Sequence, residues 1–196
     1  PTKPDQDPAT DRNNPGASYN AMIAPISGLN ISGAVFNQGY NNALGNARPS
    51  LYRQTFQAMI EDWRRAFRND KMPFCIIGLT AGGEPQTYEN FELRTTDPAP
   101  YIREAQFLAT KSLEFAEFLP AYDQQVPWYH PHKKFELGER AARWAMNTVL
   151  GHQRIGWKPV ELLSAKKNDD HFILNFEKPI RVHDGRPFSG FSISGK

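Results

Sequence analysis

The stretch "MPFCIIGLT", residues 72–80, decides the fold class of this chain. Its apolar side chains follow one another without the polar alternation that marks a strand with one face in water. A continuous run of this kind is typical of a strand that is covered on both faces, as in a parallel sheet. Parallel strands are joined by crossover connections, usually helices. We therefore expect a helix on each side of this strand along the sequence.

The sequence before this strand predicts another strand and a helix. Residues 31–37 contain a short apolar run and end in the amide-rich stretch "NQGYNN", residues 37–42. A helix is predicted within residues 47–70, because Ser50 is a good N-cap and apolar side chains recur at helical spacing. The apolar face of this helix consists of Tyr52, Phe56, Met59, Ile60, Trp63 and Phe67.

The sequence after the strand continues this alternation. A helix is predicted from Pro100, and a strand in "AEFLPAYD", residues 116–123. A further helix is predicted within residues 134–151, with Gly151 as its C′ residue. Strands that alternate with helices predict parallel crossovers and a layered α/β sheet.

The tail from about Trp157 onward has no helical period. Its short alternating apolar runs, separated by Asn-Asp-Asp and Asp-Gly turns, predict a β-rich segment. The expected organisation is a loop or linker over residues 1–18, an α/β domain over residues 19–153 and a β-rich segment over residues 154–196.

Composition narrows the class of partner. With 39% hydrophobic and 22% charged residues, the chain resembles a globular protein rather than a disordered one. A formal charge of +2, without a Lys/Arg stripe interleaved with aromatics, argues against a nucleic-acid partner. No apolar run approaches the length of a membrane span. The single cysteine, Cys75, excludes an internal disulfide and is interpreted as a small buried hydrophobe.

Candidate site residues follow the ends of two predicted strands, where open parallel sheets bind ligands. Gln38, Gly39 and Asn42 follow one strand, and Asp123 and His130 follow another. An amide and a glycine N–H can donate to a developing oxyanion, and an imidazole can serve as general base and acid. This combination predicts acyl transfer with a serine nucleophile.

Other interpretations of these residues remain open. Asn-rich turns often cap themselves through bonds from side chain to backbone. A histidine before proline is commonly a surface loop residue. His130 and His132 could form a weak metal site, but two histidines without a nearby carboxylate are a poor ligand set, so we expect no metal.

Several stretches resemble one known family. "SYNAMIAPISGLNISGAVFNQGYNNA", residues 18–43, resembles the block of sialate O-acetylesterase-like proteins of the SGNH hydrolase superfamily in which "YNxMIAPL" precedes "GxxWYQGExN". The likeness continues, in the same order as in the family, in "YRQTFQAMIEDWRRAF", "MPFCIIGL", "IREAQ", "YHPHKKFELGERAARWAM" and "DGRPFSGFSISG". Together these stretches span about residues 18–195.

This resemblance implies a flavodoxin-like three-layer sandwich, here incomplete at its N-terminus. It implies a serine-dependent enzyme that removes O-acetyl groups from carbohydrates and needs no cofactor. Because related enzymes are often exported, it also implies an extracellular or periplasmic location.

The resemblance also assigns roles to individual residues. His130 matches the catalytic histidine, and Gln38 with Gly39 matches the Gln-Gly pair of the block tied to oxyanion and substrate binding. Asn42 matches the asparagine of the same block. Supporting or substrate-side roles are implied for Arg103 and Gln106, which match an Arg-x-x-Gln pair.

The chain departs from the family pattern at several positions. Tyr40, assigned to the substrate side, replaces the glutamate of Gln-Gly-Glu, and Phe36-Asn37 replaces Trp-Tyr. The triad aspartate usually lies two or three residues before the histidine, where this chain has Pro127 and Trp128. Asp123 is the nearest carboxylate and is the expected acid partner, provided that the loop folds back.

The family nucleophile lies in a G-[DQ]-S-N motif upstream of the "YNxM" block, and no serine of this chain lies in such a motif. Two explanations compete. A second chain, such as the cleaved N-terminal part of the same precursor, supplies the serine. Alternatively, the protein is a catalytically impaired homologue that binds carbohydrate or has a structural or assembly role.

Overall fold

The computed structural model describes residues 16–44, 47–80, 98–124, 134–181 and 191. The chain divides into two compact units, Pro1–Trp157 and Lys158–Lys196, and each unit is described by itself. Most of the expected linker over residues 1–18 lies outside the described residues.

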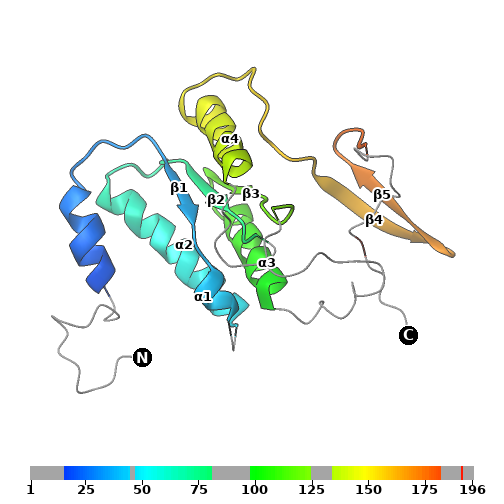
Figure 1. Ribbon diagram of the computed structural model, residues 1–196, viewed down its shortest axis with the longest axis horizontal. Helices are drawn as coiled ribbons and strands as arrows, with labels where there is room; N and C mark the ends of the chain where they lie inside the picture. The colour runs from blue at the N-terminus through cyan, green and yellow to red at the C-terminus, as the bar shows by residue number, and fades with distance from the viewer. Residues whose placement is uncertain (1–15, 45–46, 81–97, 125–133, 182–190, 192–196) are drawn as a thin grey trace. The chain divides into compact units, whose positions relative to one another are not determined.

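A parallel sheet of three strands forms the centre of the first unit (Figure 1). The strands are β1 (Ala34–Asn37), β2 (Phe74–Ile77) and β3 (Ala116–Leu119), in the order β1-β2-β3. Ala34 is in register with Phe74, and Phe74 with Ala116. All three predicted strands and their parallel arrangement are confirmed. Pro120 lies just beyond β3, where its missing N–H removes no hydrogen bond from the ladder.

Helices cover both faces of β2. Phe74 and Ile76 belong to an apolar cluster that includes residues of α2 (Pro49–Ala66) and α3 (Pro98–Lys111). Cys75 and Ile77 belong to a second cluster, with residues of α4 (Phe135–Trp144). Because alternate residues of a strand point to opposite faces, burial on both sides requires the continuous apolar run seen in the sequence.

Two helix starts differ from the prediction. Helix α2 begins at Pro49 with Arg48 in the N-cap position, so the assignment of Ser50 as N-cap was wrong. Proline favours the first helical position, because its fixed φ suits the helix and its missing N–H has no partner there. Helix α3 begins at Pro98, slightly before the predicted start at Pro100.

Short helical turns were not predicted from the sequence. They are η1 (Tyr19–Ile23), η2 (Ala24–Ile26) and α1 (Tyr40–Ala43), a single turn that directly follows the end of β1. Helix α4 continues into a π-helical turn, η4 (Ala145–Val149). Gly151 then adopts a φ of 76°, which confirms its predicted role after the helix end. Within the described ranges, no helix combines the length and apolarity needed to cross a bilayer.

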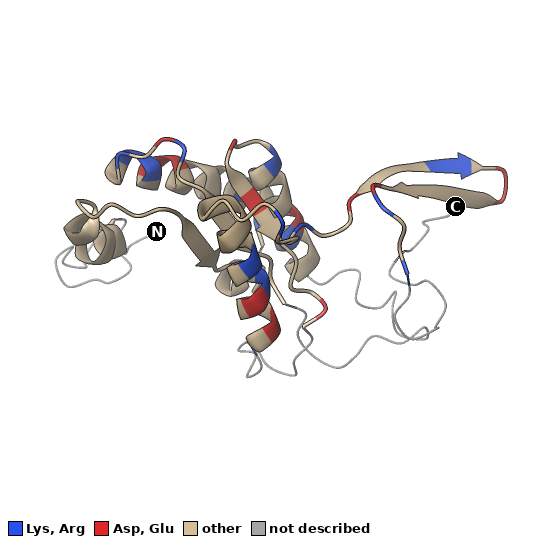
Figure 2. Cartoon of the chain, turned by 90° about the horizontal axis from the view of Figure 1, so that it is seen from above, with Lys and Arg blue, Asp and Glu red and all other residues tan. Residues whose placement is uncertain are grey.

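The described part of the second unit is an antiparallel hairpin, which confirms that β-structure follows Trp157. Strand β4 (Leu162–Asn168) pairs with β5 (His171–Phe176) across a turn in which Asp169 has a φ of 47°. Figure 2 shows basic residues on β4 and acidic residues at the turn. The closing stretch "DGRPFSGFSISG" lies outside the described residues, except for Phe191.

Candidate active site

Gln106 is the centre of a hydrogen-bond network at the carboxyl end of the sheet. It lies on α3 and is completely buried. Its Oε1 accepts a hydrogen bond from the main-chain N–H of Leu79 at 3.1 Å. Its Nε2 donates to the main-chain oxygen of Gln38 at 2.7 Å and to the Tyr52 hydroxyl at 3.2 Å. The network therefore joins α3 to the ends of β1 and β2 and to α2.

Gln38 lies one residue beyond β1 and is exposed to solvent. Its side-chain Oε1 accepts a hydrogen bond from the Tyr52 hydroxyl at 3.1 Å. Its Nε2 donates to Oδ1 of Asn42 at 2.7 Å. The amide oxygen of Gln38 therefore faces Tyr52, and its NH₂ group faces Asn42. Because this NH₂ group has two hydrogens, one of them remains after the bond to Asn42.

Gly39 meets two requirements that exclude other residues. Its φ of 140° lies in a region that L side chains rarely adopt. A Cβ atom here would also lie 3.0 Å from Nε2 of Gln106 and 3.1 Å from Cδ2 of Leu79. The carbonyl of Gly39 accepts hydrogen bonds from the main-chain N–H groups of Asn42 and Ala43, each at 3.0 Å. Gly39 thus allows the close approach of β1 to Gln106 and begins α1.

Tyr40 and Arg103, the other residues predicted on the substrate side, lie on α1 and α3. The hydroxyl of Tyr40, on α1, is hydrogen-bonded to the hydroxyl of buried Thr80, which follows β2. Arg103 is half-buried on α3, three residues before Gln106. Helices α1 and α3 are in contact. The structure therefore brings Gln38, Gly39, Asn42 and Gln106 together by direct contacts.

Tyr52 is a site residue that sequence reasoning missed, because its position on the helix assigned it to the apolar face. It is buried on α2, and burial raises the pKa of its phenol, while the hydrogen bond from Gln106 acts in the opposite direction. The available signal was chemical: a buried tyrosine hydroxyl usually requires a hydrogen-bond partner.

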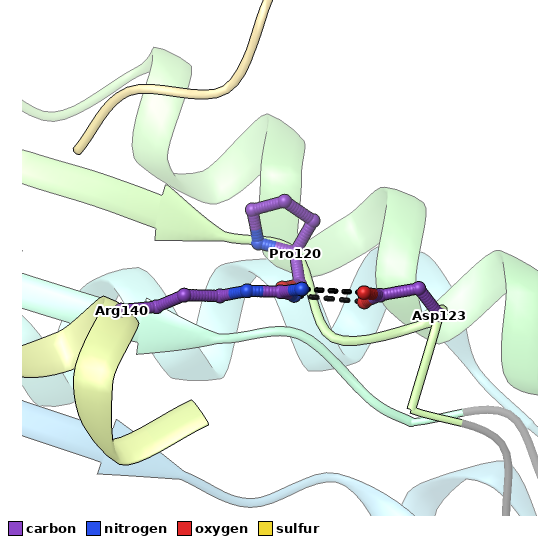
Figure 3. Close-up of polar contacts among 3 residues, drawn as sticks. All are labelled: Pro120, Asp123 and Arg140. Carbon is purple, nitrogen blue, oxygen red and sulfur yellow. Dashed lines mark hydrogen bonds and ion pairs between the residues drawn. The ribbon is translucent and has the colours of Figure 1, made fainter. Parts of the chain in front are cut away.

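Asp123, in the loop after β3, is paired with Arg140 of α4 (Figure 3). One guanidinium nitrogen of Arg140 donates to Asp123 at 2.7 Å and to the main-chain oxygen of Pro120 at 2.9 Å. The other nitrogen donates to the second carboxylate oxygen. The hydrogen bonds from Arg140 lower the pKa of Asp123, although partial burial acts in the opposite direction. Asp123 is therefore ionised at neutral pH, and both of its oxygens have a partner.

His130 lies outside the described residues, as does His132. Its pairing with Asp123 therefore stays a prediction, and the partner that the structure shows for Asp123 is Arg140. Sequence analysis did not single out Arg140, because local sequence pattern does not show that its side chain meets Asp123, 17 residues away. Among the described residues, no group of three or more His, Cys, Asp or Glu side chains could hold a metal ion.

A groove of about 480 Å³ opens beside Gln38. Its lining comes from β1, from α1 and the residues that flank it, and from the segment Arg48–Met59, which includes more than half of α2. Amide groups lie on one part of this lining and apolar side chains on the rest. The lining residues are Phe36, Gln38, Asn41, Asn42, Leu44, Arg48, Leu51, Tyr52, Thr55, Phe56 and Met59.

Comparison with known proteins finds sequence similarity to sialate O-acetylesterases. Sialate O-acetylesterases of Homo sapiens and Pongo abelii are each 39% identical to this chain over 70 residues, which is 32% of this chain and 13% of each enzyme. The match thus spans only a small part of the length of these relatives. The enzyme of Rattus norvegicus is 41% identical over 51 residues. No protein-family model matches the chain.

The fold of this chain is similar to that of a solved carbohydrate acetylesterase. The crystal structure of a carbohydrate acetylesterase from Xanthomonas citri matches this chain with a TM-score of 0.69 and 25% identity, covering 81% of this chain and 35% of that one. The resemblance predicted from the motifs is confirmed: the chain is similar to sialate O-acetylesterases in part of its sequence and to a carbohydrate acetylesterase in its mixed α/β fold with a parallel sheet.

Proposed function

We propose that this chain is part of a serine-dependent carbohydrate O-acetylesterase built on a flavodoxin-like SGNH hydrolase sandwich. The observation that carries the proposal is the pair Gln38–Gly39 at the tip of β1, held by the buried amide of Gln106. Rigid donors at the end of a parallel strand suit a developing oxyanion. The likeness to carbohydrate acetylesterases supports the same reaction class.

In the proposed reaction, a serine hydroxyl attacks the carbonyl carbon of an acetyl ester and passes its proton to His130. The negative charge that develops on the carbonyl oxygen is stabilised by donors from Gln38 and Gly39. The sugar oxygen then leaves with the proton from His130, which gives the free sugar hydroxyl and an acetyl-enzyme. His130 next takes a proton from water, which attacks the acetyl carbonyl, and returns it to the serine oxygen as acetate leaves. The reaction requires neither a metal nor a redox cofactor.

The remaining predicted residues have secondary roles in this proposal. Asn42, Tyr40 and Arg103 lie on the substrate side, on α1 and α3. Gln106 has a supporting role, because all its hydrogen bonds point into the protein and it is fully buried. Asp123 is the proposed acid partner of His130. In this role its carboxylate would accept a hydrogen bond from His130 while it remains bonded to Arg140.

We place the nucleophilic serine on a segment outside this chain, carried by a second chain. Among the described residues, β1 pairs only with β2 and forms one edge of the sheet. The groove beside it is lined by β1, α1 and the region of α2, and by no residue of β2 or β3. A further parallel strand that pairs with β1 would cover this apolar lining and bring a serine to the strand tips. Acetylated carbohydrate is the proposed substrate, the location is extracellular or periplasmic, and neither nucleic acid nor membrane is a partner.

A second function is favoured by two specific observations. Tyr40 stands where the resemblance implies a carboxylate, and the carboxylate of Asp123 is engaged by Arg140. The first observation removes a carboxylate from the block tied to oxyanion and substrate binding. The second weakens a catalytic triad, since a histidine without an acid partner loses control of its tautomer. The alternative is a catalytically impaired homologue that binds carbohydrate or has a structural or assembly role.

Intact mass and N-terminal sequencing of native material test the source of the serine. The proposal expects a co-purifying peptide with a Gly-x-Ser-Asn motif and hydrolysis of 4-nitrophenyl acetate by the complex. His130→Ala should abolish this hydrolysis, whereas His152→Ala, at an exposed position after η4, should leave it unchanged. Activity that survives His130→Ala would remove His130 from the mechanism. Binding of acetylated sugar without hydrolysis would favour the alternative function.

A further inference from the structure

We propose that Tyr52 is a positioning residue that orients the carboxamide of Gln38, as the last step of a directional hydrogen-bond relay through Gln106. This inference rests on the proposed function of Gln38 as an oxyanion donor. The relay starts at a main-chain group of the β2 segment and ends at the solvent-exposed tip of β1.

The direction of the relay is set by the main chain. The N–H of Leu79 can only donate, so the atom of Gln106 that faces it at 3.1 Å must be the carbonyl oxygen. The other end of the Gln106 amide is then its NH₂ group. One of its hydrogens meets the main-chain oxygen of Gln38, which can only accept. Two main-chain groups of opposite character therefore exclude the flipped orientation of Gln106.

The second hydrogen of Gln106 fixes the role of Tyr52. It is donated to the Tyr52 oxygen at 3.2 Å, so the phenol hydrogen remains to be donated elsewhere. The main-chain oxygen of Gln38 lies 3.3 Å away but already accepts from Gln106, and the side-chain Oε1 of Gln38 is nearer, at 3.1 Å. The phenol hydrogen is thus directed to Oε1 of Gln38.

The consequence is that the Gln38 amide has a preferred face. With Oε1 held by Tyr52, the NH₂ group points outward, where Oδ1 of Asn42 accepts one hydrogen at 2.7 Å. An exposed glutamine without this constraint can flip and present its oxygen to the oxyanion, which would repel it. The phenol of Tyr52 therefore biases Gln38 towards the donor orientation before substrate binds.

Steady-state kinetics of the native complex test this role. Because one neutral hydrogen bond controls the bias, Tyr52→Phe should lower kcat by about 3- to 10-fold with KM unchanged. Gln38→Ala should lower kcat by roughly 100-fold, because it removes a donor to the oxyanion. In the Gln38→Ala background, Tyr52→Phe should have no further effect. Tyr101→Phe, at an exposed position on α3, is the matched control and should leave kcat unchanged.

A second measurement does not depend on activity. In ¹⁵N-resolved NMR spectra, Tyr52→Phe should shift the side-chain NH₂ resonances of Gln38 towards those of a free glutamine. The NH₂ resonances of Gln106 should keep their slow exchange with water, because the bonds to Leu79 and to the Gln38 main chain remain.

The outcomes separate this inference from the proposed function. If kcat falls equally in both backgrounds, or if the Gln38 resonances do not change, Tyr52 does not position Gln38. If the native complex shows no esterase activity at all, the proposed function is wrong, and the Gln38 resonances alone decide whether the relay exists.

Discussion

Gly39 shows how one residue can decide the shape of the candidate site. Its backbone φ of 140° and its approach to Gln106 both depend on the missing side chain. An alanine Cβ would contact Nε2 of Gln106 at 3.0 Å, and Gln106 cannot retreat without losing its bonds to Leu79 and Gln38. A side chain at position 39 would therefore disturb the hydrogen bonds that Gln106 makes in the relay.

We expect Gly39→Ala to lower the free energy of unfolding by about 1–3 kcal/mol, because the new Cβ is strained in φ and in contact distance. Urea unfolding followed by circular dichroism measures the loss. Gly138→Ala is the control: Gly138 lies inside α4, a Cβ there meets nothing within 4 Å, and alanine should stabilise that helix by a few tenths to 1 kcal/mol. Equal effects of the two substitutions would contradict the strain at Gly39.

Cys75 is expected to be inert in the folded protein. It is completely buried on β2, and burial, with the nearby charge of Glu117, raises the pKa of its thiol to about 12. The thiolate is the reactive form, so reaction with 5,5′-dithiobis(2-nitrobenzoate) at pH 8 should be negligible. Addition of 6 M guanidinium chloride should release one reactive thiol per chain. Rapid labelling without denaturant would show that β2 is accessible.

At the scale of elements, Arg64 joins α2 to the beginnings of two strands. Although it is charged, it is buried. Its Nε donates to the main-chain oxygen of Met72 at 3.1 Å, and its Nη2 donates to the main-chain oxygens of Glu114 and Phe115 at 2.8 and 3.0 Å. The guanidinium suits this position, because its fixed fork of donors can reach carbonyls from two chain segments at once.

Arg64→Met should lower the free energy of unfolding by about 2–4 kcal/mol, because it leaves three main-chain oxygens without their side-chain donor. Its neighbour offers a matched control. Arg65 is exposed and forms a surface ion pair with Asp62, so Arg65→Met should cost about 0.5 kcal/mol or less. Thermal or urea unfolding measures both losses. Similar losses for Arg64→Met and Arg65→Met would contradict the structural role of Arg64.

The pair Asp123–Arg140 links the loop after β3 to α4 and should make stability depend on pH. Since Arg140 lowers the pKa of Asp123 in the folded state, the pair stabilises the fold above the ordinary carboxyl pKa of about 4. This stability is lost as the pH falls through the lowered pKa. Both side chains are partly exposed, so the contribution at neutral pH is about 1 kcal/mol or less.

Asp123→Asn should therefore reduce the free energy of unfolding at pH 7, and the difference from the parent chain should shrink between about pH 4 and pH 2. Urea titrations at several pH values measure this difference. Glu139→Gln removes a different partner from α4, the surface pair with Arg143, and serves as the control for charge removal. A difference that stays constant with pH would show that Asp123 does not titrate with a lowered pKa.

At the scale of the whole molecule, charge is nearly balanced. The chain has 23 Lys and Arg residues and 21 Asp and Glu residues, and both signs occur along the helices in the described part of the chain (Figure 2). Binding to nucleic acid requires several basic side chains that together neutralise phosphates. The balance of charge in the sequence therefore does not predict a strong interaction with the phosphates of nucleic acid.

We expect no binding to duplex DNA in gel-shift experiments at 150 mM salt, with any residual affinity weaker than about 10⁻⁴ M. A lysine-rich DNA-binding protein in the same buffer is the positive control. Binding that persists at this salt concentration, and weakens steeply as salt is raised, would reveal a basic surface that the balance of charge does not predict.

The elements of the first unit follow from local pattern to a large extent. The continuous apolar run of β2 predicts a strand covered on both faces, and the spacing of Tyr52, Phe56 and Ile60 predicts the buried face of α2. The helix start at Pro49 and the single turn α1 were missed, because a few residues carry too little periodicity to distinguish a turn from a loop. The position of the amide cluster after β1 was predicted correctly, since parallel strands place their carboxyl ends together.

The sequence by itself determined where the three parallel strands and the longer helices of the first unit lie, and that amides follow the end of β1, because these properties depend on residue order and periodicity. Only the tertiary structure decided which side chains meet. Gln106 is hydrogen-bonded to Gln38, 68 residues away in the sequence, and Tyr52 is bonded to Gln38, 14 residues away. Arg140 is bonded to Asp123, 17 residues away. Such hydrogen bonds depend on how helices pack on the sheet, and local sequence pattern does not encode that packing.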